Sequence, residues 1–175
     1  MLAPAERRKL RDLGVQIGRE AAYMPALLKP KAIDLRNIIW AAWTESKPIA
    51  PLPQGRVSLP ASPGVESTTY EALGFTLLGR RAVRIDILER LAHQAWERSK
   101  SGGFGLAPEL LSMCGCGREE LGNILSELGY LAKGEGNNQI FHRQRKPRKS
   151  IRQKRSQSPK PDSPFAVLQN LSKRS

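Results

Sequence analysis

The sequence has few of the residues on which metal-binding, redox or disulfide-stabilised proteins depend. Of its 175 residues, two are cysteine and two are histidine. Cys114 and Cys116 are one residue apart, so a disulfide between them would be strained, and a structural zinc site would need two further ligands at suitable spacing. His93 and His142 lie on different predicted elements. We therefore expect two reduced thiols in a bend, with no metal site and no cofactor.

Long apolar runs are also missing. The apolar stretches are short and are interrupted by Lys, Arg or Pro, and the first ten residues, MLAPAERRKL, are charged where a signal peptide would have an apolar core. These features predict a soluble, cytoplasmic protein without a membrane partner.

Recognisable catalytic motifs are absent from the sequence. No GxxxxGK[ST] loop is present, and the segment GGFGLAPE lacks the lysine and the preceding strand of such a loop, so it predicts a loop that ends a helix. Glu119 and Glu120 open a predicted helix, where carboxylates stabilise the positive N-terminal end. No serine lies in a nucleophile elbow. We expect no enzymatic activity from this chain alone.

Acidic residues are scarce relative to basic ones. The chain has 29 Lys and Arg against 16 Asp and Glu, a formal net charge of +13. A surplus of this size on a small protein is typical of a polyanion-binding protein, and nucleic acid is the first candidate partner.

Residues 1–46 predict a helical segment, which Pro25 and Pro30 interrupt. Two apolar patterns at helical spacing support it: Leu10, Leu13 and Ile17, then Ile33, Ile38, Ile39, Ala42 and Trp43. Residues 47–66 are rich in proline, which blocks a helix and donates no hydrogen bond to a sheet, so they predict a linker.

Residues 67–143 predict a winged-helix-like α+β unit within a mostly α protein. A short helix and a strand come first, followed by a long amphipathic helix over 84–100. Shorter helices over 108–113 and 118–128 flank a bend at 115–117, and apolar residues recur at helical spacing in the second of them. Residues 130–143 predict a small hairpin around GEGNN.

Residues 144–175 predict a disordered basic arm. Nine Lys or Arg and no acid occur between Arg143 and Lys160, and so polar a segment cannot offset its ordering entropy alone. Near the end, Phe165, Leu168 and Leu171 are spaced three apart and predict a short apolar stripe that docks on a partner.

The helix over 118–128 is a poor reader of a major groove, because Glu119, Glu120 and Glu127 would face phosphates. Asn123 could contact an adenine, and Arg118 a guanine or a phosphate. We therefore expect mainly backbone contacts, with local pairing to Asp86 or Glu89 as the alternative role of the first three arginines. The predicted nucleic-acid contacts are Arg80, Arg81, Arg84, Arg118, Asn123, Lys133, Arg143, Arg145, Lys146, Arg148, Lys149, Arg152, Lys154 and Arg155.

Several segments together resemble the C-terminal region of alphaproteobacterial superfamily 2 helicases related to the mitochondrial degradosome RNA helicase. They are GFTLLGRRAVRIDILERLA, APELLSMCGCGREELGNILSELGY and SPFAVLQNL, and residues 6–43 are similar to the stretch that follows the motor in those proteins. The family is ATP-dependent, but its catalytic motifs lie in motor domains that this chain lacks.

The resemblance implies a non-catalytic nucleic-acid-binding accessory region of a helicase, present as a fragment or a split subunit. Two alternatives stay open. One is a protein-interaction module that docks on a separate helicase motor, and the other is a free-standing winged-helix DNA-binding regulator. Backbone charge binds both RNA and DNA, so the sequence does not distinguish these two substrates.

Overall fold

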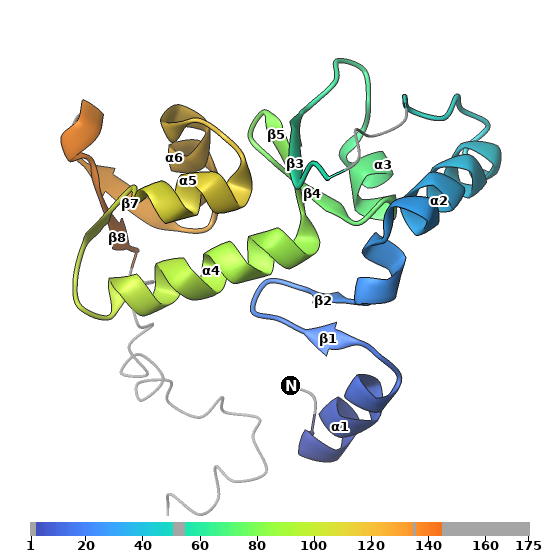
Figure 1. Ribbon diagram of the computed structural model, residues 1–175, viewed down its shortest axis with the longest axis horizontal. Coiled ribbons are helices and arrows are strands. Elements are labelled where there is room, and N and C mark those ends of the chain that lie inside the picture. The colour runs from blue at the N-terminus through green and yellow to red at the C-terminus, as the bar shows by residue number, and fades with distance from the viewer. Residues whose placement is uncertain (1–2, 51–54, 135, 145–175) are drawn as a thin grey trace, which may run out of the picture. The chain divides into compact units, whose positions relative to one another are not determined.

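The computed structural model describes residues 3–50, 55–134 and 136–144 (Figure 1). The predicted basic arm and the stripe of Phe165, Leu168 and Leu171 lie outside these residues. The described part mixes helices with three small antiparallel sheets. The expectation of a mostly α protein therefore needs correction, because short strands pair between the helices along much of the chain.

The N-terminal segment is only partly helical. Helix α1 (Pro4–Asp12) is followed by two short antiparallel strands, β1 (Gln16–Ile17) and β2 (Ala22–Tyr23), then a 3-10 turn, η1 (Pro25–Leu28), and helix α2 (Pro30–Trp43). The prediction that Ile17 lies on a helix was wrong. Gly14 adopts a φ of +80°, which glycine tolerates and other residues rarely do, and the chain leaves α1 there.

The middle of the chain forms a three-stranded sheet in the order β3-β5-β4. Helix α3 (Ser67–Ala72) precedes the hairpin of β4 (Phe75–Leu78) and β5 (Arg81–Arg84), and β3 (Ser58–Pro60) pairs with the free side of β5. Part of the segment expected to be a linker is thus a strand. Its proline is compatible with the sheet because β3 is an edge strand, paired on one side only.

The sheet has its own small core, to which α2 and α3 both contribute. The buried residues of this cluster are Ile33, Tyr70, Leu73, Phe75 and Ala82. The indole Nε1 of Trp40 donates a hydrogen bond to Thr69 Oγ1 at 3.2 Å, and Asn37 exchanges two hydrogen bonds with the backbone of Ile49. These contacts fix α2 and the chain after it against α3.

The last part of the chain confirms the predicted helices and hairpin. Helix α4 (Ile85–Ser99) leads to a short strand, β6 (Phe104–Gly105), then to α5 (Pro108–Cys114), α6 (Arg118–Glu127), β7 (Tyr130–Lys133), a 3-10 turn η2 (Gly136–Asn138) and β8 (Ile140–Arg143). The sheet order is β6-β8-β7. Strand β6 was expected to be a loop, because two residues that pair with distant β8 leave no periodic signal.

The apolar stripes of α4 and α6 meet in the main core. Fully buried members include Leu91, Leu110, Leu121, Ile124, Leu125 and Phe141. Each predicted stripe is buried on the face where its helical spacing placed it, so the local pattern determined which side of each helix turned inward.

Glu89 attaches the N-terminal strands to α4. Glu89 is 8% exposed, and its carboxylate accepts hydrogen bonds from the backbone amides of Arg19, Glu20 and Ala21. A Cβ atom at Gly18 would lie 2.1 Å from the carboxylate carbon, so any side chain there would displace the Glu89 carboxylate. The alternative expectation that Glu89 pairs with Arg80, Arg81 or Arg84 is therefore wrong.

Candidate nucleic-acid interface

Helices α5 and α6 form the helix-turn-helix expected from the sequence. The chain turns at Gly115, whose φ of +59° is accessible to glycine at low cost. Gly117 then precedes α6, and its amide donates a hydrogen bond of 2.9 Å to Oε2 of Glu120. One face of α6 packs into the core and the other is exposed. The exposed face carries the side chains of Arg118, Glu119, Asn123, Ser126 and Glu127.

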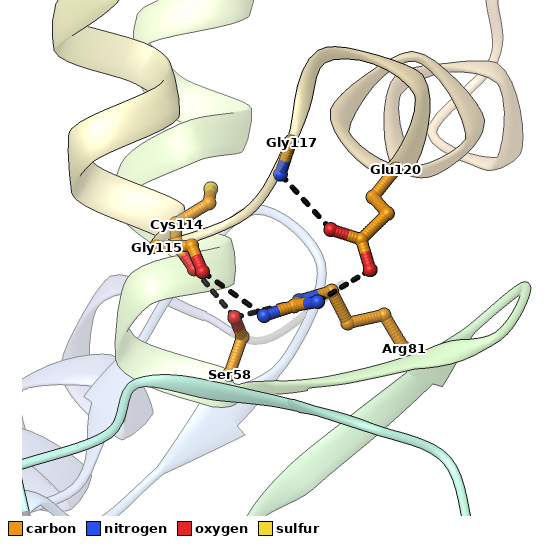
Figure 2. Close-up of polar contacts among 6 residues, drawn as sticks. All are labelled: Ser58, Arg81, Cys114, Gly115, Gly117 and Glu120. Atoms are coloured by element: carbon orange, nitrogen blue, oxygen red, sulfur yellow. Dashed lines mark hydrogen bonds and ion pairs between the residues drawn. The ribbon is translucent and has the colours of Figure 1, made fainter.

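Arg81 of β5 attaches the sheet to this bend (Figure 2). Its Nε donates to Ser58 Oγ at 2.9 Å, its Nη2 donates to the Gly115 carbonyl at 2.9 Å, and its Nη1 forms an ion pair with Glu120. Ser58 Oγ in turn donates to the carbonyl of Cys114. Arg81 is 8% exposed, so this predicted nucleic-acid contact is wrong and its guanidinium is committed to the fold.

The same contacts keep Glu120 ionised. The hydrogen bond from the Gly117 amide and then the Arg81 guanidinium lower the pKa of the Glu120 carboxyl, although burial acts in the opposite direction. Glu120 therefore keeps its negative charge at neutral pH and completes the pairing of Arg81.

Cys114 and Cys116 are free thiols in the bend, as expected. A hydrogen bond between the two side chains, together with burial, raises the pKa of Cys114. The same bond and the nearby charge of Arg81 lower the pKa of Cys116, while burial opposes them. The two thiols thus differ in acidity, and the half-buried Cys116 is the more acidic one.

The turn between β4 and β5 approaches the exposed face of α6. A Cβ atom at Gly79 would lie 3.4 Å from Oε1 of Glu127 and 3.9 Å from Cβ of Asn123. The face of α6 that would enter a major groove is therefore acidic and lies against a neighbouring turn. Both features oppose sequence reading by this helix.

The other two of the first three predicted arginine contacts, Arg80 and Arg84, differ in their surroundings. Arg80 is exposed in the β4–β5 turn. Arg84 donates from Nε and Nη2 to the two carboxylate oxygens of Asp86, at 2.7 and 2.9 Å. Only Arg80 of this group lies free on the surface of the described part, and Arg84 follows the alternative of local pairing.

The hairpin of β7 and β8 carries the next two predicted contacts, Lys133 and Arg143. Both side chains are exposed. In the strand register Lys133 pairs with Ile140 and Tyr130 with Arg143, so the two cations lie at opposite ends of the ladder, about 10 Å apart along the strands. They do not form one cluster.

One basic group was missed by the sequence reasoning. Helix α1 carries four exposed cations, Arg7, Arg8, Lys9 and Arg11. The run ERRKLR was the available signal, but its charge was used only as evidence against a signal peptide. This helix is the densest basic element among the described residues.

Most of the net charge nevertheless lies beyond the described residues. Residues 145–175 hold ten of the 29 Lys and Arg but one of the 16 Asp and Glu, and so account for nine of the thirteen net positive charges. Seven of the predicted contacts, from Arg145 to Arg155, fall in this segment. The described part is therefore only mildly basic.

Comparisons with protein-family models, curated proteins and solved structures found nothing that matches this chain. Among the described helices, none combines the length and the apolar character that a bilayer-spanning helix requires.

Proposed function

We propose that this chain is a non-catalytic, nucleic-acid-binding accessory region of an ATP-dependent helicase. The observation that carries the proposal is the net charge of +13, concentrated in residues 145–175. Cations that contact phosphates bind nucleic acid without regard to sequence and release counterions as they do so. The helicase context comes from the resemblance of the sequence segments described above.

The element order α4, β6, α5, α6, β7, β8, with β8 between β6 and β7, supports a winged-helix-like unit. In this proposal the unit serves as a scaffold, not as a sequence reader. Insertion of α6 into a groove is disfavoured, because its acids would face phosphates and the turn at Gly79 lies against its exposed face. This disfavours a free-standing DNA-binding regulator.

The test is fluorescence anisotropy of the whole chain, and of a chain ending at Arg143, against single-stranded RNA and duplex DNA across a salt series. We expect log K to fall with log salt by about 0.9 per phosphate neutralised on duplex DNA, and the shorter chain to give a flatter slope. No binding of either nucleic acid at low salt would refute the proposal.

A matched pair of variants separates backbone contact from sequence reading. Arg118→Gln on α6 and Arg80→Gln in the β4–β5 turn each remove one exposed positive charge. We expect both to weaken binding uniformly across duplex sequences. A change of sequence preference in the Arg118 variant alone would instead revive the regulator hypothesis.

A second function, docking on a separate helicase motor, is favoured by the exposed apolar face of α2. Leu35, Ile38, Ile39 and Trp43 share one side of the helix and are 58%, 59%, 57% and 82% exposed. Such a stripe is typical of a protein-binding surface. Loss of co-purification with a superfamily 2 motor in Ile38→Glu, with binding retained in Ser126→Glu, which adds the same charge on α6, would support it.

A further inference from the structure

A cavity of about 490 Å³ lies against the β4 hairpin, away from the helix-turn-helix. Its walls come from β2, η1, α2, α3 and β4, which places residues from the N-terminal segment opposite residues of the central sheet. Its volume is within the range of sites that bind small organic groups. None of the predicted nucleic-acid contacts lines it.

Most of the wall is apolar, and part of it is exposed to solvent. Met24 and Leu27 line the cavity and are 37% and 41% exposed. Tyr23 adds an aromatic ring, and its hydroxyl already donates a hydrogen bond of 2.7 Å to Oε1 of Gln16, whereas Phe75 is 3% exposed and its ring belongs to the core of the sheet. The wall therefore suits a group with apolar faces, which would cover Met24 and Leu27.

Two charged groups of opposite sign complete the lining, Arg36 of α2 and Glu71 of α3. Arg36 is half-buried, and this burial lowers its pKa. Neither residue belongs to an ion pair within the described residues. A guanidinium only donates hydrogen bonds and a carboxylate only accepts them, so the cavity offers both kinds of partner.

An apolar wall with one guanidinium and one carboxylate favours some classes of ligand over others. A fatty acid or another simple carboxylate would gain from Arg36 but would be repelled by Glu71. A nucleobase has flat apolar faces together with donors and acceptors along its edges, and so matches the Tyr23 ring, the guanidinium and the carboxylate at once. An unpaired base can leave its strand at little cost, whereas a base in a duplex must first be unpaired.

We propose that this cavity receives one unpaired base of a single-stranded nucleic acid. The proposal rests on the proposed function and deepens it, because it adds a contact that backbone charge alone does not provide. It predicts that the chain distinguishes a strand with bases from the same strand without them.

The experiment measures anisotropy of the whole chain with fluorescein-labelled oligoadenylate RNA and with an abasic sugar-phosphate strand of equal length. We expect affinity for the abasic strand to be about tenfold lower, the order of effect for one lost stacked base. Arg36→Gln and the cavity-filling Ala22→Phe should lower affinity for oligoadenylate to a similar extent. Ala22→Phe should leave the abasic strand unaffected, and Arg36→Gln should weaken binding of that strand no more than loss of a positive charge outside the cavity does.

The control is Lys31→Gln, which removes one positive charge from the same helix outside the cavity. It should change binding of both strands equally. The unmodified chain gives an independent measurement: the methyl NMR signal of Met24 should shift on addition of oligoadenylate but not of the abasic strand, while that of Met113 on α5 should shift with neither. This measurement decides the question even if a cavity variant fails to fold.

Equal affinity for the two strands, with no base-dependent shift at Met24, would overturn the inference and leave the proposed function intact. Absence of binding to both strands would reject the inference, and absence of binding to duplex DNA as well would reject the proposed function.

Discussion

Replacing Arg81 tests whether the contacts between the central sheet and the helix-turn-helix stabilise the fold. The Arg81→Met variant keeps an apolar stem of similar length but removes the donors to Ser58, Gly115 and Glu120. Hydrogen bonds that involve a charged group contribute about 1.5–3 kcal/mol each, and loss of one partner of a buried ion pair costs about 3–5 kcal/mol.

For Arg81, the cost of losing the ion pair lies near the lower limit, about 3 kcal/mol, of the range for buried pairs. The Glu120 side chain is 41% exposed, so water recovers part of its lost interaction, whereas the Arg81 side chain is only 10% exposed. We expect Arg81→Met to lower the free energy of unfolding by about 3 kcal/mol. That is a large part of the stability of a domain of this size.

The assay is urea unfolding of the whole chain, followed by circular dichroism. Arg80→Met is the matched control, since the neighbouring side chain is exposed, and it should change stability by less than about 0.5 kcal/mol. A double-mutant cycle with Glu120→Gln isolates the ion pair from the other contacts. If both methionine variants have the same small effect, Arg81 does not hold the two parts together.

The remaining predictions concern the N-terminal strands and the bend. Gly18→Ala should displace Glu89 and speed hydrogen exchange at the amides of residues 19–21. Gly105→Ala is the control, because its φ is not positive and a Cβ atom there would lie 3.9 Å from its nearest neighbour, the Gln139 carbonyl. The pKa of the Glu120 carboxyl is lowered in the folded chain from its ordinary value of 4.5. The charged carboxylate should therefore stabilise the fold above pH 4.5, and this contribution should be lost as the pH falls through the folded pKa. Urea unfolding should accordingly give converging stabilities for the native chain and Glu120→Gln in acid. Iodoacetamide should alkylate Cys116 faster than buried Cys114, as peptide mass spectrometry would reveal; equal rates would contradict the assigned acidities.

The helices and the hairpin of residues 84–143 were predictable because their signals are local. Apolar residues at helical spacing fixed the inner faces of α4 and α6, and glycines marked the bend. By contrast, β3 lies in a proline-rich stretch, and only its pairing with β5, which follows later in the chain, makes it a strand. A single sequence contains no local signal for such a partner.

The candidate site was predicted less well than the fold. Arg80, Arg81 and Arg84 look alike in the sequence, but the structure exposes one, buries one and pairs one with Asp86. Burial of a charged side chain depends on partners distant in sequence, here Glu120. The apolar pattern of α2 was recognised, but spacing alone does not indicate whether other residues cover that face.

The contact of Glu89 with the β1–β2 turn sets an order of events during synthesis. The amide of Arg19 and the carboxylate that it binds are 70 residues apart in the chain. Strands of two residues are too short to persist as an isolated hairpin in water. Residues 16–23 therefore cannot reach their final contacts until residue 89 has emerged from the ribosome.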